Sequence, residues 1–458
     1  MMSHPRPLVA AAALWFLALL PLPTTAQEPP AAEPRFWIET ITIEGPHRVS
    51  EEILLSEARL EEGREYGEEA LRQAIRRIQR LPFILEADFA LRKGSERGKY
   101  ALVITLVETR RFFYGFDTNL LRLAEPLDLD SGVFSEEEEL IALTAGVRLF
   151  VGPRGVAFLS LGGRFGVQAG YTQYDLFGRG SFLNVGLGWN ICCSQRIFPL
   201  GLDPTFSSWY LDDSREVSIT AGLPLEGSRS LQFSATVLDS NDRFGRRRTV
   251  RGPFFFRDST DFSDLEVLRL EGRWLLDDRD DALFPTRGDL FSLGLSYTAL
   301  RAPVEFVHLT FDPFGEERIP VGEYDAGLLE LRGDATRYWP LSPRQTLSAG
   351  VGVGFGVSRV ENVPVDADTV INDDLTSVSA NLRVGYSVSL WSPETARRRG
   401  DFRFELSGEY AYEQVSPDLD LPDNPLERID LGAALSLRSR WGLFRLRFSF
   451  VDVGEILR

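Results

Sequence analysis

The chain has 458 residues and a formal net charge of −17, an acidic balance that argues against nucleic acid as a partner. Its length is ample for several domains. The only cysteines are the neighbours Cys192 and Cys193, which form neither a disulfide framework nor a metal-ligand spacing. We interpret them as two thiols at a strand end, with a strained vicinal bridge as the alternative in an oxidising compartment.

The first 26 residues have the features of a secretory signal peptide. A positively charged start precedes an apolar run from Leu8 to Leu20, and cleavage is expected after Ala26. The run is too short to span a bilayer as a helix, and no longer apolar stretch follows it. A membrane location would therefore require a closed β-barrel. Residues 27–35 are rich in Pro and Ala and predict a short linker.

Residues 36–109 predict a small α+β domain. The expected elements are a strand, two helices and a hairpin of two strands: Trp37–Glu44, a short helix capped by Ser50, Glu68–Leu81, Ala87–Arg92 and Lys99–Glu108. The second helix carries one apolar stripe and stops at Pro82. The five elements fit in about half the length of a typical domain.

Two-faced strands recur from residue 110 to 458. In the stretch from Phe402 to Val415, Phe404 and Leu406 fall on one face, and Arg403 and Glu405 fall on the other. A charge buried in a dry core costs several kcal/mol. Because so many strands carry a charged face, a soluble sandwich is disfavoured. In an outer-membrane barrel the charged face lines a wet lumen and the apolar face meets lipid. We predict a mainly β protein with a transmembrane antiparallel barrel of about 16 strands.

Three stretches of the barrel region predict loops: Leu123–Leu140, Leu200–Asp213 and Val360–Asp374. The Arg-rich segment from Asn241 to Thr260 is irregular and receives no assignment.

Two short motifs and the small domain carry a family resemblance. Tyr174–Gly180 (YDLFGRG) resembles the "NLFGRG" turn of BamA/TamA-like barrels, and Asp277–Gly288 (DDRDDALFPTRG) resembles their later "D-x-x-x-FPT-x-G" turn. Residues 36–109 resemble a POTRA domain. From Trp37 onward the chain thus resembles the BamA/TamA-like superfamily, as a surface-antigen-type barrel with a single POTRA domain. The motif residues are Phe177, Gly178, Arg179, Gly180, Phe284, Pro285, Thr286 and Gly288.

The resemblance implies a barrel in the bacterial outer membrane with its POTRA domain in the periplasm. It implies assistance in the assembly or translocation of other proteins, with an extended client captured on a POTRA edge strand by β-augmentation. The seam between Phe112–Leu120 (or the next strand) and Leu443–Val453 would open or thin the bilayer. The implied partners are outer-membrane lipids, unfolded outer-membrane or secreted clients, and periplasmic accessory proteins. No cofactor is expected.

Two departures from the family pattern lead to an alternative function. The superfamily carries an Arg-Gly-Phe/Tyr motif in a loop that folds into the lumen, and the matching residues 358–375 lack it. A similar string, Val250–Phe254, precedes the FPTRG turn and so lies elsewhere. The chain also continues beyond Phe450, where such barrels usually end on an aromatic residue. The alternative is a pore-forming or structural barrel without insertase activity.

The sequence does not predict an enzyme. A Ser-His-acid site would need His308, whose neighbours Phe306 and Leu309 indicate an ordinary strand position. The acidic pairs Asp277-Asp278 and Asp373-Asp374 could suit calcium, but solvated loop charge is the better interpretation. We therefore expect no catalytic residue and no metal site.

Overall fold

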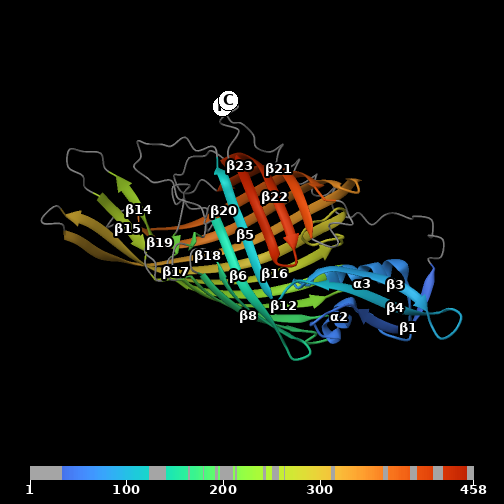
Figure 1. Ribbon diagram of the computed structural model, residues 1–458. Helices are drawn as coiled ribbons and strands as arrows, with labels where there is room; N and C mark the ends of the chain where they lie inside the picture. Colours follow the sequence, from blue (N-terminus) through green and yellow to red (C-terminus); the bar gives the residue numbers. More distant parts are fainter. Residues whose placement is uncertain are drawn as a thin grey trace.

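The computed structural model shows a large β-barrel with a small domain at one end (Figure 1). We call the end that carries the small domain the near end. The structure describes residues 34–122, 141–162, 166–178, 180–190, 194–195, 210–211, 214–240, 244–249, 257–262, 264–310, 315–364, 370–391, 400–415 and 426–450. Among these residues, no helix is long and apolar enough to cross a membrane.

The small domain is a four-stranded sheet covered by two helices. Its elements are β1 (Arg35–Glu44), α2 (Glu51–Ala58), β2 (Arg64–Gly67), α3 (Glu68–Gln79), β3 (Ile84–Lys93) and β4 (Lys99–Glu108). The sheet order is β2-β1-β4-β3, with β1 parallel to β4. Apolar residues from both helices and the sheet share one core, and its fully buried members include Ile38, Ile53, Leu54, Leu71, Ile78, Leu102 and Ile104.

Local signals in the sequence set the helices of this domain. The Ser50 hydroxyl accepts a hydrogen bond from the Ile53 amide over 3.4 Å, as expected for the residue that caps α2. Helix α3 begins with Glu68 and Glu69, which favour a helix N-terminus, and ends at Gln79, two residues before the predicted end. The short strand β2 was not predicted, because only its pairing with β1 defines it.

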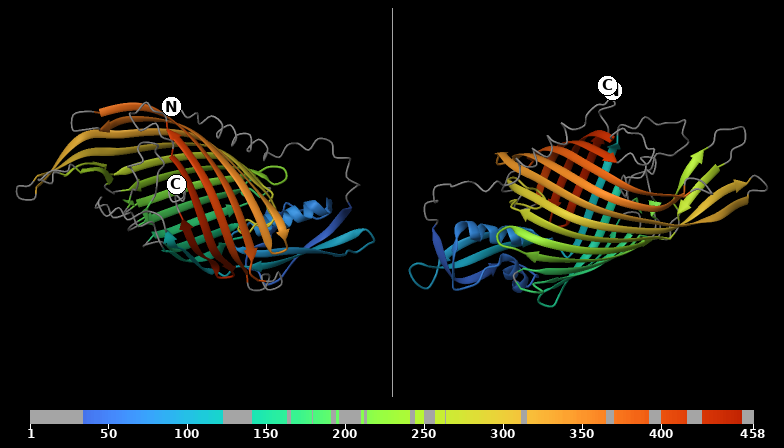
Figure 2. Two further views of the ribbon diagram at one scale, coloured as in Figure 1. Left: turned by 90° about the horizontal axis from the view of Figure 1, so that it is seen from above. Right: turned by 180° about the vertical axis from the view of Figure 1, so that it is seen from behind.

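The barrel contains 15 strands in the described part of the chain. They are β5 (Phe112–Arg122), β6 (Ile141–Val151), β7 (Gly155–Gly162), β8 (Gly166–Tyr174), β9 (Phe182–Asn190), β12 (Ser214–Pro224), β13 (Arg229–Ser240), β16 (Leu265–Asp277), β17 (Gly288–Thr310), β18 (Gly315–Ser342), β19 (Gln345–Pro364), β20 (Val370–Ser389), β21 (Asp401–Val415), β22 (Leu426–Ser439) and β23 (Gly442–Phe450). Two short strands, β10 (Ser194–Gln195) and β11 (Tyr210–Leu211), pair outside the wall. The wall strands are tilted and wrap around a central space (Figure 2).

The wall has 15 strands in the described part of the chain, where the sequence predicted about 16. Neighbouring wall strands run antiparallel, and with 15 of them the first and last run in the same direction. Strand β23 therefore pairs with β5 in parallel, from Gly442 beside Tyr114 to Ser449 beside Arg122. We call this pair the seam. An even number of strands would have closed the barrel with an antiparallel pair.

Two further segments differ from the sequence interpretation. Most of the predicted loop Val360–Asp374 continues β19 and β20, which pair as far as Pro364 and Val370. The unassigned segment from Asn241 holds a hairpin of β14 (Phe244–Thr249) and β15 (Arg257–Phe262) that projects beyond the wall (Figure 1). Strands of 20 to 28 residues exceed the roughly 9 to 11 needed to span a bilayer, so these hairpins extend far past it.

The two faces of the wall differ as predicted. On β17 the outward side chains Leu293, Leu295 and Tyr297 are 43–53% exposed. On the other face Asp334 pairs with Arg332 and Arg383, at 3.1 and 2.8 Å. A Cβ added to Gly352 would lie 2.8 Å from the Asp334 carboxylate, so polar side chains crowd together on this face. Crowding of this kind marks the concave inside, and the apolar face is the outer surface.

Several predicted features lie outside the described residues. They are the signal peptide 1–26, most of the linker 27–35, the loop 123–140, most of the loop 200–213, Arg179, Cys192, Cys193, the string 250–254 and the residues after Phe450. No group of His, Cys, Asp and Glu side chains in the described part of the chain is arranged to hold a metal ion.

Candidate functional site at the junction of the small domain and the barrel

The small domain lies against several consecutive near-end turns of the barrel. At the β6–β7 turn, Arg154 Nε lies 2.9 Å from Glu52 Oε2, and the Ser50 hydroxyl donates to the Pro153 carbonyl. At the β12–β13 turn, Arg59 Nη1 donates to the Leu225 carbonyl over 2.7 Å. These contacts come from helix α2 and its two ends, so this helix is the side of the domain that meets the first half of the barrel.

One aromatic residue joins the cores of the two domains. Phe83 follows Pro82 and is 1% exposed. Its ring meets the rings of Phe150 and Tyr174 edge to face, at centroid distances of 5.4 and 6.0 Å. Both partners lie at the near ends of barrel strands β6 and β8. The core of the small domain is thus continuous with the barrel wall.

The β8–β9 turn contains the first sequence motif. Gly178 and Gly180 adopt φ of 76° and 77°, the left-handed region that favours glycine. A Cβ on Gly180 would lie 3.1 Å from the Ser56 carbonyl of α2, so the close approach of the domain depends on this glycine. Phe177 is 74% exposed and does not pack into the junction.

Glu57 is the titratable group that faces this turn. Its pKa is raised to about 7. Burial is the main cause and nearby Asp175 adds to it, while Arg59 and Arg77 oppose the rise. The proton on this carboxyl therefore exchanges near neutral pH. The net charge where α2 meets the β8–β9 turn therefore changes near neutral pH as well.

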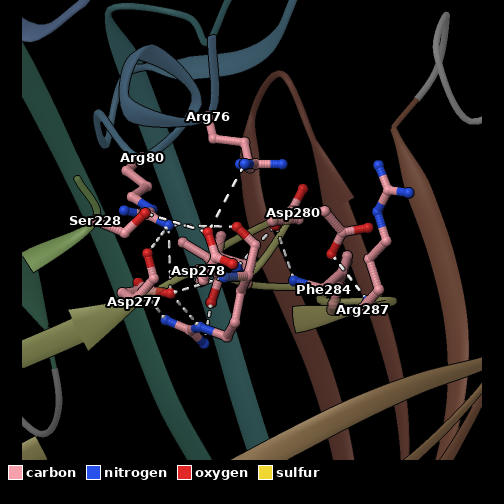
Figure 3. A network of polar contacts seen from close by, with 12 residues as sticks. Arg76, Arg80, Ser228, Asp277, Asp278, Asp280, Phe284 and Arg287 are labelled. Atoms are coloured by element: carbon pink, nitrogen blue, oxygen red, sulfur yellow. Dashed lines mark hydrogen bonds and ion pairs between the residues drawn. The ribbon is translucent and has the colours of Figure 1, made fainter. Parts of the chain in front are cut away.

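The β16–β17 turn contains the second motif and is held by its own carboxylates (Figure 3). Asp280 Oδ1 accepts from the amides of Thr286 and Arg287 over 2.8 and 3.2 Å. Asp281 Oδ1 accepts from the amides of Leu283 and Phe284 over 2.8 and 2.9 Å. Each acidic residue thus closes part of the turn, which explains why a bend of this length needs them.

Phe284 is the residue that this turn places inside the barrel mouth. It is 2% exposed, and the guanidinium carbons of Arg403 and Arg438 lie 5.0 and 5.5 Å from its ring centroid. Arg438 also binds Asp281 over 2.7 Å. Burial alone would raise the pKa of Asp281, but Arg438 and the backbone donors outweigh it and the pKa is lowered. The turn is thereby fixed to strands β21 and β22 on its inner side.

Helix α3 binds the outer side of the same turn (Figure 3). Arg80 Nη2 lies 3.4 Å from Asp277 Oδ1 and also donates to the carbonyls of Asp277 and Arg279. Asp277 is 6% exposed and pairs in addition with Arg279 over 2.9 and 3.0 Å. Arg76 lies 3.7 Å from Asp278. The acidic start of the motif thus anchors the arginines at the C-terminal end of α3.

A cleft of about 660 Å³ lies between α3, the edge strand β3 and the β16–β17 turn. Among the described residues, strand β3 pairs only with β4, and the residues from Glu86 to Phe89 line this cleft. Gln79 Nε2 donates to the Ala87 carbonyl over 2.8 Å, and Asp88 Oδ1 accepts from the Phe89 amide over 2.8 Å. The Ala87 carbonyl and the Phe89 amide are therefore already bonded within the domain. The next outward backbone position, Leu91, lies beyond the residues that line the cleft, and an extended segment could pair with the edge there.

The structure assigns positions to the motif residues, but the sequence did not indicate their partners. Phe284, Pro285, Thr286 and Gly288 form the turn that binds α3, and Gly178 and Gly180 form the turn that meets α2. The sequence signal for this docking is the group of arginines near the end of α3, followed by Leu81-Pro82-Phe83. Its meaning depends on contacts with residues far along the chain.

These features define an outer-membrane β-barrel with a periplasmic domain docked on its near-end turns. Residues 162–369 match the Omp85 superfamily domain, and residues 37–109 match the POTRA family described as surface antigen variable number repeat. The two matches together place an Omp85 superfamily barrel domain behind one POTRA domain. The barrel lies in the outer membrane and the POTRA domain lies in the periplasm.

The chain is similar in fold to three solved structures. BamA from Haemophilus ducreyi lacking POTRA domains 1-3 is 14% identical, with a TM-score of 0.43 over 92% of this chain and 82% of that chain. CdiB from Acinetobacter baumannii is 10% identical, with a TM-score of 0.37 over 91% of this chain and 74% of that chain. CdiB from Escherichia coli is 11% identical, with a TM-score of 0.32 over 96% of this chain and 93% of that chain. A search of curated proteins found no match.

Proposed function

We propose that this barrel assists the assembly or translocation of other proteins at the outer membrane. The observation that carries the proposal is the outer edge of β3, which has no strand partner in the described part of the chain and lies beside the 660 Å³ cleft near the barrel mouth. A client in extended form would add a strand to β3 through main-chain hydrogen bonds, with little demand on its sequence. The role is one of binding and guidance, and we expect no enzymatic activity.

The barrel seam supports the same proposal. Parallel pairs are slightly less stable per residue than antiparallel pairs, and the β5–β23 seam is the parallel pair of this wall. Its register shifts between Arg447 and Ser449, which weakens the pairing toward the far end. Strand β5 of this seam directly follows the POTRA domain in the chain. A client released from β3 would therefore meet the barrel close to its least stable strand pair.

The experiment that tests the proposal is depletion of the protein, followed by measurement of outer-membrane protein levels. Lower levels of several barrel proteins, with normal synthesis in the cytoplasm, would support assembly. Lower levels of one secreted product alone would support translocation. Unchanged levels of both classes would contradict the proposal.

A second candidate function is a pore or structural barrel, which the charged inner face favours. Arg332, Asp334 and Arg383 form an ion-pair cluster on this face. A wet lumen lined by such charges suits ion passage. The described part of the chain also holds long paired strands where the family's lumen loop is expected. Conductance of the purified protein in planar bilayers, together with unchanged protein levels on depletion, would favour this function.

A further inference from the structure

A groove of about 920 Å³ lies on the outer surface of the barrel beside the seam. Its sides are apolar, with Phe116 and Phe444 across the seam and Leu143 on β6. Its floor is formed by small residues, and Ala145 is exposed there. The volume falls within the range of about 300 to 1,000 Å³ that is typical of small-molecule sites.

The groove exists because the wall changes height next to the seam. Strands β7 and β8 have 8 and 9 residues, and their paired ends are Gly162 and Gly166. Gly162 lies beside Thr144 of β6. Strands β5 and β6 have 11 residues each and continue further (Figure 1). The groove thus opens on the lipid-facing surface, where an apolar hollow would be filled by a hydrocarbon chain.

The near end of the groove carries unneutralised positive charge. The guanidinium carbon of Arg110 lies 3.9 Å from the ring centroid of Trp441, and the Arg110 amide donates to the Arg440 carbonyl over 2.7 Å. Trp441 and Tyr114, whose rings are 6.2 Å apart, form the mouth of the groove. Both arginines are exposed, and neither forms an ion pair with a carboxylate in the described part of the chain.

This combination is the chemistry that recognises an anionic phospholipid. Tryptophan and tyrosine rings prefer the headgroup level of a membrane, and a guanidinium binds phosphate oxygens in a forked geometry. The rings therefore place the arginines at the depth of the phosphate, with the apolar hollow on the hydrocarbon side. We propose that the groove binds one anionic glycerophospholipid of the periplasmic leaflet, with an acyl chain along the hollow and its phosphate on Arg110 and Arg440.

Charge sets the expected preference for the headgroup. A basic residue near a membrane surface favours anionic lipid by about fivefold, so the two arginines together give a preference of more than tenfold. The site would hold a lipid at the seam, where β5 and β23 meet. This inference is independent of the client-handling proposal, because it concerns the resting barrel.

The test uses fluorescence quenching of Trp441 by lipids with brominated acyl chains. The full-length protein is reconstituted in phosphatidylcholine vesicles, and brominated phosphatidylglycerol or brominated phosphatidylcholine is titrated in. The signal of Trp441 is the difference between the wild type and Trp441→Phe. We expect brominated phosphatidylglycerol to quench this signal at a mole fraction at least tenfold lower than brominated phosphatidylcholine.

Three variants separate the headgroup from the groove. Arg110→Gln with Arg440→Gln should abolish the difference between the two lipids, and Ala145→Leu should reduce quenching by both because it fills the floor. Arg344→Gln, an exposed near-end arginine in the β18–β19 turn, is the matched control and should retain the full preference. Heat-modifiable migration on a gel verifies that each variant is folded.

Three outcomes would overturn the proposal. Equal quenching by both brominated lipids in the wild type would show ordinary contact with bulk lipid. A preference that survives in the double arginine variant, with the fold intact, would place the headgroup elsewhere. Weak quenching by either lipid in the wild type would mean that protein covers the groove, which also contradicts lipid binding.

Discussion

Replacement of Arg80 by alanine would remove one of the two arginines that join helix α3 to the β16–β17 turn, the other being Arg76. The Arg80 guanidinium makes an ion pair with Asp277 and donates to two backbone carbonyls of the turn. The Arg80 side chain is 24% exposed and that of Asp277 is 8% exposed, so solvent screens the interaction only in part. Hydrogen bonds to charged groups contribute about 1.5 to 3 kcal/mol each in such settings.

The loss has an upper bound because Asp277 keeps a partner. Arg279 binds the same carboxylate through two hydrogen bonds, so Arg80→Ala does not leave a buried charge unpaired. We therefore expect a cost of about 1.5 to 3 kcal/mol in docking, which corresponds to a roughly 10- to 100-fold lower ratio of docked to undocked domain. Arg72→Ala on the same helix removes only an exposed pair with Glu68, which solvent screens, and should leave docking unchanged.

Distance measurements between spin labels can detect this shift. Labels at Glu96 in the POTRA domain and Arg344 in the β18–β19 turn lie at exposed positions, and Cys192 and Cys193 would be changed to serine. Electron–electron double resonance in nanodiscs should show one narrow distance for the unsubstituted chain and for Arg72→Ala. Arg80→Ala should add a broad population. Identical distributions for both variants would refute the role assigned to Arg80.

Two further predictions concern pH and the seam. The pKa of Glu57 is raised from 4.5 to about 7, so its contribution to docking is complete below about pH 4.5 and is lost as the pH rises through 7. The docked population, measured by the same spin-label distances, should therefore fall between pH 5 and 8. Glu57→Gln should remove this pH dependence. Gly442→Ala would place a Cβ 1.7 Å from the Tyr114 carbonyl, so the temperature of heat-modified migration should fall far more than for Gly152→Ala, which has φ of 65° but open space.

Much of the POTRA domain could be predicted from the sequence because its signals are local. The cap at Ser50 and the apolar stripe of α3 each depend on residues within one helix. The alternation of Phe404 and Leu406 with Arg403 and Glu405 likewise belongs to a single strand, and it predicted the two faces of the wall. Strand β2 lacked such a signal, since it has four residues and exists only through its partner β1.

The features that the sequence did not predict depend on distant partners. The strand number is a property of the closed wall, and a local pattern cannot show that β23 meets β5 in parallel. The polar composition of Val360–Asp374 predicted a loop, but pairing between β19 and β20 extends both strands through it. The motif residue Phe284 was predicted as part of a turn, whereas its burial between Arg403 and Arg438 depends on strands more than a hundred residues later.

We propose that clients bind the outer edge of β3 before they reach the barrel. The most direct measurement is the folding rate of an unfolded outer-membrane barrel protein into liposomes that contain this protein. Leu91→Pro removes an outward amide of β3. Arg97→Pro is the control, because Arg97 precedes Gly98 (φ 91°) in the turn closed by the Lys99 amide and the Glu96 carbonyl, a position that favours proline. We predict faster client folding with the wild type and Arg97→Pro and a loss of this acceleration with Leu91→Pro. Equal acceleration by all three, or none by the wild type, would contradict the claim.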